Sequence, residues 1–330
     1  MKRWIALAAV MALAFALQGC GLKDINLFKK TEAPVEYSEN RLLSVNGIES
    51  DYREALLYLL SAKESAEKLY GAGIWDLVLD ENGTTYGSLR KKQVLEEYTE
   101  LKIICAYAKD MGVELYEEEN RDIASYTADF IERAGRDKLL KYNISESVVK
   151  TLYTNNTLAN KVYEAVTLSV DTNVPDSEAR LGKYQYIFKT KYKKTESGTE
   201  IPLTGEEVES LREDMRVLRE TATKRSDFLS FAKLNTDDTK AEINAGRDDF
   251  GEASGTVMAL ADGELSPVLE TGDGFYIVKC VKAVDEEATA ANREKIVLAR
   301  QAERFAELLK TWKANAIVDT DYKKWESLNP

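Results

Sequence analysis

The side chains that could carry chemistry in this sequence are few, because it contains no histidine. That absence excludes His-based triads, HExxH zinc sites and ordinary acid–base catalysis by imidazole. Three cysteines remain, Cys20, Cys105 and Cys280, with neither a Cys-x-x-Cys pair nor a glycine-rich phosphate loop. The usual catalytic signatures are therefore absent, and we expect neither a metal nor a cofactor.

The segment before Cys20 is typical of a secretory signal. Lys2 and Arg3 precede an uncharged, mostly apolar run over residues 4–17, and Gly19 stands directly before the cysteine. The run is shorter than the ~20 residues that a membrane-spanning helix needs. We therefore predict a signal peptide over residues 1–19. An ordinary signal peptide followed by a chance cysteine is the alternative.

The residues around this cleavage point add a more specific expectation. Leu17-Gln18-Gly19-Cys20 resembles the lipobox of bacterial lipoproteins, although Gln18 is not the usual small residue at its position. The resemblance implies that Cys20 is acylated and anchors the chain at the cell membrane, facing the extracytoplasmic side. More than one acyl chain gives stable anchoring, whereas a single chain holds only marginally.

The charge of the chain bears on its partners. The formal net charge is −12, and loss of Lys2 and Arg3 with the signal peptide makes it −14. Nucleic acids are bound through basic surfaces, so we expect no nucleic-acid partner. The acidity suits weak contact with basic or unfolded polypeptides, and it equally suits simple solubility.

The hydrophobic pattern divides the chain at Pro175. Residues 20–44 are polar, and we expect them to form a tether. Residues 45–174 carry several apolar stripes at helical spacing, which predicts a helical domain. Residues 175–285 read as strand, helix, helix and strand, which predicts a small α+β domain. One long helical pattern in residues 286–330 has no partner of its own, so we expect it to return to the first helices. Because Cys105 and Cys280 fall in different domains, we expect two buried free thiols.

This arrangement resembles the PrsA/SurA class of extracytoplasmic foldases, in which a helical chaperone domain carries an inserted parvulin (PpiC-type) domain. Five short matches in the same order carry the resemblance, and each of them is weak alone. They are residues 45–47 (Val-Asn-Gly), 109–119 (a Gly followed by three Glu), 174–179, 227–233 (Asp-Phe-Leu-Ser-Phe-Ala-Lys) and 263–279.

The resemblance implies a prolyl isomerase site, and the sequence departs from it. Active parvulins generally carry a His on the first strand and another on the last, and the matching positions here are Tyr186 and Tyr276. Only eleven residues separate Gly251 from Gly263, about half the usual length of the segment that forms the prolyl pocket. We expect Met258, in this segment, to lie in the core. Rotation about the prolyl bond faces a barrier of ~18–20 kcal/mol, which a shaped pocket must lower. Two tyrosine hydroxyls could preserve a hydrogen-bond network, but we expect the isomerase activity to be weak or lost.

Three functions remain open from the sequence. The leading interpretation is a membrane-anchored chaperone or foldase for unfolded exported polypeptides, with Trp75 in the 71–87 insertion as a candidate client contact; a buried Trp75 is the alternative. The 17 Tyr, 9 Phe and 4 Trp could supply a binding surface for such clients. The second is an active parvulin-type isomerase, and the third is a non-catalytic surface lipoprotein that binds another component.

Overall fold

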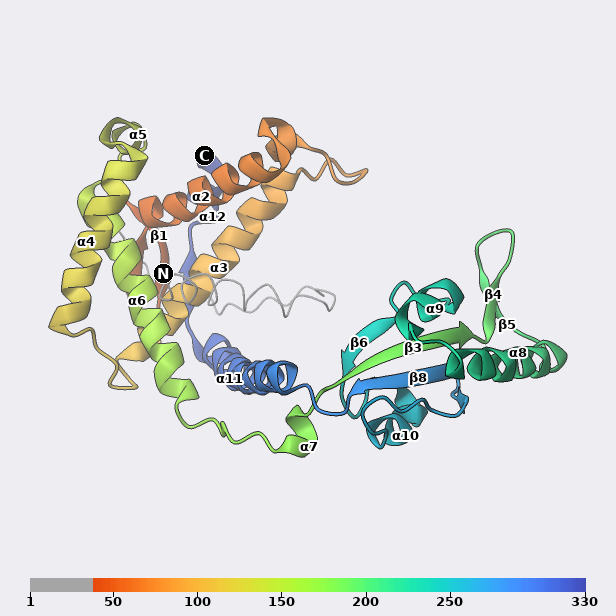
Figure 1. The fold of residues 1–330 in the computed structure, drawn as a ribbon. Helices are drawn as coiled ribbons and strands as arrows, with labels where there is room; N and C mark the ends of the chain where they lie inside the picture. The colour runs from red at the N-terminus through yellow and green to blue at the C-terminus, as the bar shows by residue number, and fades with distance from the viewer. Residues whose placement is uncertain (1–37) are drawn as a thin grey trace. The chain divides into compact units, whose positions relative to one another are not determined.

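The computed structural model describes residues 38–330, and it confirms the predicted α+β fold class (Figure 1). The predicted signal peptide and Cys20 lie outside the described residues. The chain forms two compact units. The helical unit comprises the described residues up to Ser169 together with Gln301–Pro330, and the sheet unit comprises Val170–Arg300.

Helices dominate the helical unit. Its elements are β1 (Arg41–Val45), β2 (Ile48–Asp51), α2 (Tyr52–Tyr70), the 3-10 helix η1 (Ala72–Asp76), α3 (Tyr86–Ala108), α4 (Glu117–Ala134), α5 (Arg136–Lys141), α6 (Glu146–Thr167), the second half of α11 (Glu286–Asn315), β9 (Val318–Thr320) and α12 (Tyr322–Ser327). The side chains of Asp51, Thr85 and Ser145 each accept a hydrogen bond from a first-turn N–H of α2, α3 and α6, which fixes where these helices begin. Within residues 38–330, no helix is both long and apolar enough to span a membrane.

The C-terminus completes the core of the helical unit, which confirms the predicted returning helix. Strand β1 lies between β2 and β9, with Leu43 opposite Thr320. From α11, Trp312 stacks on Tyr107 of α3 with ring centroids 5.4 Å apart, and Trp325 of α12 is fully buried in the same cluster. Strand β1 and the C-terminal segment therefore share one hydrophobic core.

A buried carboxylate, that of Glu54, joins three helices of this unit. Glu54 is only 1% exposed and lies in the first turn of α2, where the helix dipole favours a negative charge. Its Oε2 accepts hydrogen bonds from the Tyr98 hydroxyl at 2.8 Å and from Lys102 Nζ at 3.1 Å, both on α3. Its Oε1 accepts from Asn155 Nδ2 of α6 at 2.6 Å. The network fixes α2 against both α3 and α6.

The sheet unit is built on one antiparallel sheet of order β6-β3-β8-β7. Its elements are α7 (Asp176–Ala179), β3 (Gly182–Thr190), β4 (Tyr192–Lys194), β5 (Glu200–Pro202), α8 (Gly205–Thr223), α9 (Phe228–Asn235), β6 (Glu242–Ala245), η2 (Gly251–Ala253), α10 (Ser254–Met258), β7 (Leu269–Glu270), β8 (Gly274–Lys282) and the first half of α11. Successive side chains of a strand point to opposite faces. Ile187 and Ile277 therefore pack with α8 and α9 on one face, while Tyr184, Tyr186 and Val278 pack on the other.

Two local expectations differ from the structure. The predicted tether of residues 20–44 runs too far, because Leu42 and Leu43 are fully buried in β1, and burial of two such side chains stabilises a strand over a solvated linker. The apolar run at residues 74–79 divides into η1 and a single antiparallel bridge between Val78 and Thr85. The compact units divide the chain at residues 169/170 and 300/301, against expected boundaries at 174/175 and 285/286.

Glu54→Ala should strongly destabilise the helical unit. The substitution leaves the Lys102 ammonium, whose side chain is only 10% exposed, without its carboxylate, and breaking such a largely buried pair costs about 3–5 kcal/mol. Trp75, Trp312 and Trp325 all lie in the helical unit and none lies in the sheet unit, so urea unfolding followed by tryptophan fluorescence measures this unit alone.

The matched control is Glu64→Ala on the same helix. Glu64 pairs with Lys138 at the surface, and such exposed pairs contribute at most about 1 kcal/mol. Equal destabilisation by the two substitutions would contradict the role given to Glu54.

Candidate functional site

The two tyrosines at the expected catalytic positions lie on neighbouring strands of the sheet unit. Tyr186 on β3 stands opposite Val278, and Tyr276 on β8 stands opposite Phe188. The two tyrosines are therefore diagonal neighbours on one face, with ring centroids 6.2 Å apart. Tyr186 is buried and Tyr276 is half-buried. The structure brings the two predicted positions together.

Phe250 covers both tyrosine rings. It contacts Tyr184, Tyr186 and Tyr276 edge to face, with centroid distances of 5.9, 5.9 and 5.6 Å, and is only 4% exposed. Its backbone N–H donates to Ser254 Oγ at 3.0 Å, which holds the turn before α10 in place. The space above this face of the sheet is therefore filled by an aromatic side chain of the protein itself.

Two of the three tyrosine hydroxyls on this face are already engaged, those of Tyr184 and Tyr186. The Tyr186 hydroxyl donates to Asp238 Oδ2 at 2.7 Å, and that of Tyr184 donates to Met258 Sδ at 3.5 Å. Burial raises the pKa of Tyr186, and the adjacent carboxylate of Asp238 raises it further. Burial likewise raises the pKa of Tyr276. Both phenols stay neutral at physiological pH, so they could donate a hydrogen bond but could not act as bases.

Sequence reasoning missed the roles of Phe250, Asp238 and Phe188. Phe250 lies in a polar segment between Gly246 and Gly251, and its contact with β3 depends on tertiary packing. Asp238 lies in an exposed loop beyond α9, and nothing in its neighbourhood distinguishes it from a solvated acid. Phe188 has a recognisable signal, because it continues the alternation of Tyr184 and Tyr186 on one face of β3. Met258 packs against the same aromatic cluster, as expected.

Trp75, the predicted client contact, is half-buried in the helical unit. Its indole packs on Gly87, where a Cβ would come within 2.6 Å of Nε1, and it meets Tyr86 edge to face at 6.3 Å. Lys63 Nζ lies 5.8 Å from its ring centroid. Trp75 therefore mainly holds η1 against the start of α3. The apolar side chains that follow it in the chain are exposed instead.

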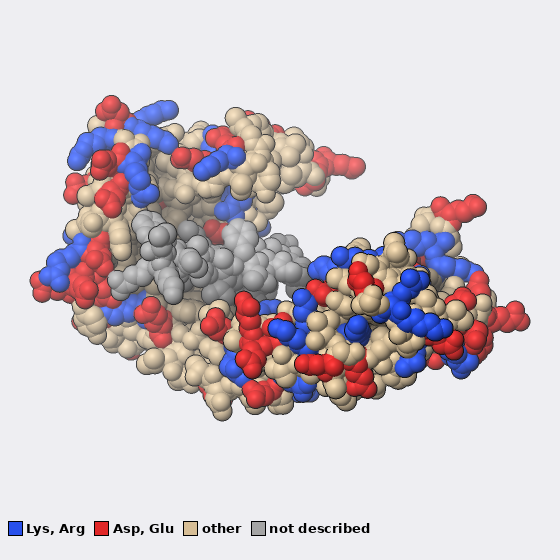
Figure 2. Space-filling view, viewed as in Figure 1, with Lys and Arg blue, Asp and Glu red and all other residues tan. Residues whose placement is uncertain are grey.

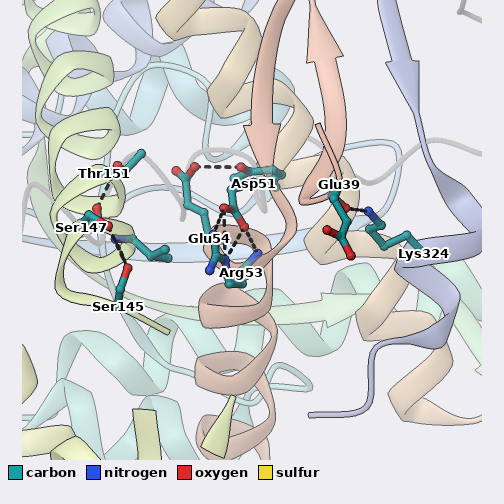
Figure 3. Close-up of polar contacts among 10 residues, drawn as sticks. Glu39, Asp51, Arg53, Glu54, Ser145, Ser147, Thr151 and Lys324 are labelled. Atoms are coloured by element: carbon teal, nitrogen blue, oxygen red, sulfur yellow. Dashed lines mark hydrogen bonds and ion pairs between the residues drawn. The ribbon is translucent and has the colours of Figure 1, made fainter. Parts of the chain in front are cut away.

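A polar pocket of about 220 Å³ lies where α2 begins, facing α6. Figure 3 shows Asp51, Arg53 and Glu54 at the start of α2 across from Ser147 and Thr151 on α6. The two carboxylates at this helix start are already paired, Asp51 with Arg53 and Glu54 with the Lys102 ammonium. The pocket thus lies at the solvent-exposed edge of the hydrogen-bond network around Glu54.

The remaining thiols are both free, as expected. Cys280 is buried, whereas Cys105 is half-buried, so the expectation of two buried thiols is wrong for the latter. Its Sγ nevertheless donates to the Asn155 carbonyl at 3.4 Å, and burial raises its pKa to about 12. Such thiols are unreactive at neutral pH. Across residues 38–330, no group of three or more Cys, Asp or Glu side chains is arranged to hold a metal ion.

This α+β chain, whose helical unit is closed by a returning C-terminal helix and which carries an antiparallel sheet unit, is similar to PrsA/SurA-type foldases. The comparisons with known proteins confirm this predicted resemblance. No model of a known protein family matches the chain.

The relatives themselves are named foldase protein PrsA. That of Clostridium acetobutylicum is 25% identical over 254 residues, which cover 71% of this chain and 74% of the relative. That of Clostridium kluyveri is 21% identical and the match covers 98% of this chain and 94% of the relative. Among solved structures, the peptidylprolyl isomerase PrsA of Bacillus cereus is 14% identical, with a TM-score of 0.34 over 77% of this chain and 93% of that one.

Tyr186→Phe should change how stability depends on pH. The raised pKa of Tyr186 favours its neutral form in the folded state, so its contribution is fully present below about pH 10 and is lost as the pH rises further. At pH 7 the variant should lose about 1 kcal/mol of unfolding free energy with the hydrogen bond to Asp238. The difference between wild type and variant should shrink above pH 10.

Calorimetry of the sheet-unit transition measures this difference, because the unit has no tryptophan. Tyr192→Phe on β4, where the side chain is exposed, is the matched control and should leave the pH dependence unchanged. A constant difference between wild type and Tyr186→Phe from pH 7 to 11 would contradict the assigned environment.

Proposed function

We propose that this protein is a chaperone-type foldase that assists the folding of exported polypeptides outside the cytoplasmic membrane. Two relatives bearing the name of a foldase support this, one of them matched over nearly the whole chain. The helical unit, closed by α11 and β9, corresponds to the part that the resemblance assigns to chaperoning. Its partners are unfolded or newly exported polypeptides.

The proposal includes a lipid anchor. A signal peptide over residues 1–19 leads the chain out of the cytoplasm, and acylated Cys20 then holds it at the cell membrane. The short segment after Cys20 serves as the tether. In this proposal the sheet unit, Val170–Arg300, is the parvulin-like domain, inserted between the two parts of the helical chaperone unit.

We further propose that the prolyl isomerase activity is weak or lost, because Phe250 covers the site. Catalysis requires a pocket that holds the twisted prolyl amide more tightly than the planar one. Here the corresponding face of the sheet is covered by Phe250, and the hydroxyl of Tyr186 is committed to Asp238. A prolyl ring could enter only if Phe250 left its buried position. Binding without prolyl catalysis is what this arrangement supports.

The protein should not accelerate proline-limited refolding. At micromolar concentration, the slow phase of refolding of a substrate with a cis-proline, followed by fluorescence, should change by less than about twofold, because the pocket is filled. An active parvulin in the same assay is the positive control. A clear acceleration that Tyr186→Phe or Tyr276→Phe abolishes would instead establish the isomerase alternative.

The protein should suppress aggregation of an unfolded client. Light scattering of chemically denatured citrate synthase after dilution should fall by about half or more at equimolar protein, because an exposed apolar surface competes with client self-association. Serum albumin is the control for nonspecific protection. Unchanged scattering at equimolar protein would contradict the chaperone proposal whatever the result of the refolding assay.

A further inference from the structure

An exposed apolar surface lies at the end of α2 and in the segment that follows η1, within the helical unit. Figure 2 shows an uncharged surface over the end of α2 and the start of α3, with acidic side chains at its far end. We call its exposed apolar residues the apolar tip. They are Leu69, Tyr70, Leu77, Val78 and Leu79, with exposed fractions of 74%, 67%, 50%, 57% and 47%.

Hydrogen bonds join the backbone of residues 77–86, which carries Leu77, Val78 and Leu79 of the apolar tip. Leu79 N–H donates to the Thr84 carbonyl at 2.8 Å, and Tyr86 N–H donates to the Leu77 carbonyl at 2.8 Å. Between them, Asp80 Oδ1 accepts hydrogen bonds from two backbone N–H groups, those of Asn82 and Thr84. The apolar side chains are thus held out in solvent by a fixed turn.

This hydrogen-bond pattern leaves one backbone edge open. In an antiparallel bridge of this kind, the N–H and C=O of the bridged residue itself point away from its partner strand. The groups of Val78 therefore face outward, and within residues 38–330 no hydrogen bond is recorded for them. Those of Thr85 on the other strand are occupied, because its N–H donates to Ser88 Oγ and its carbonyl accepts from Leu89 N–H. Val78 provides the open edge, with a leucine on either side.

The charge and chemistry of the apolar tip favour a polypeptide as its occupant. An outward-facing N–H and C=O pair is complementary to another peptide backbone, whereas lipid chains offer it no partner. Asp76, Asp80 and Glu81 are exposed around the tip, and these acids would repel an anionic lipid surface while attracting basic residues of a client.

We propose that an extended apolar segment of an unfolded polypeptide binds the apolar tip by adding a strand along Val78, with Leu77 and Leu79 contacting its side chains. This site deepens the proposed chaperone function and rests on it. Backbone pairing makes recognition largely independent of client sequence, and the leucines select apolar segments.

Substitutions at Val78 separate backbone pairing from apolar contact. Val78→Pro removes the outward N–H and retains an apolar side chain, and Leu77 already has the extended backbone, φ −64° and ψ 119°, that a residue before proline needs. Val78→Thr keeps the N–H and the shape of the side chain and is the matched control. Leu77→Ser with Leu79→Ser removes the apolar contacts.

The probe is fluorescently labelled, reduced and carboxymethylated α-lactalbumin, which stays unfolded, and binding to the purified protein is measured by anisotropy. Val78→Pro should weaken binding about fivefold, the loss expected for one backbone hydrogen bond. The double serine variant should weaken it about tenfold or more, and Val78→Thr should stay within twofold. Unchanged tryptophan emission and thermal midpoint check that each variant is folded.

The outcomes distinguish this site from the proposed function. If wild type and all variants bind equally, the apolar tip is not the site, although the chaperone function stands. If wild type does not bind the probe, the chaperone function itself fails. Binding of wild type, but not of the serine variant, to phosphatidylglycerol vesicles would overturn the proposal in favour of a membrane contact. A dimer that Val78→Pro dissociates, measured by sedimentation, would overturn it in favour of self-association.

Discussion

In the helical unit, the carboxylate of Glu54 is removed from water and must be compensated by other groups. Tyr98 and Lys102 reach it from α3 and Asn155 reaches it from α6, so the spacing of three helices is set by one side chain. An apolar residue at this position would pack without needing hydrogen-bond donors at defined positions. The network also positions the start of α2, and the far end of that helix carries Leu69 and Tyr70 of the apolar tip. A buried charge and part of an exposed apolar surface thus belong to one helix.

The sheet unit has two faces of different character. One is an ordinary apolar core in which Ile187 and Ile277 lie beneath two helices. The other gathers aromatic rings, and Phe250 closes it. In a catalytic sheet, polar donors and an open pocket would face solvent at some cost in stability. The rings here gain burial and edge-to-face contacts, and the face becomes a second core.

Much of this fold could be predicted from the sequence, because its helices have regular apolar stripes and capping residues such as Asp51 and Ser145. The proximity of Tyr186 and Tyr276 followed from their places on two strands of one sheet. The closure by Phe250 could not be predicted, because it depends on how a short loop packs in three dimensions. The exposure of Val78 could not be predicted either, because the sequence pattern of an apolar run is the same whether the run is buried in a sheet or held in solvent by a turn.

The pairing of β1 with β9 has a consequence for the order of assembly. Leu43 and Thr320 are neighbours in space although almost the whole described chain separates them, whereas the sheet unit is one continuous segment. Because the chain emerges N-terminus first, the sheet unit can fold first, since all of its strands are present before α11 is complete. The helical unit has to wait for Trp312 and Trp325 to bury its remaining apolar surface. Until then, the apolar surface of the helical unit stays exposed, and exposed apolar surface of this kind favours aggregation.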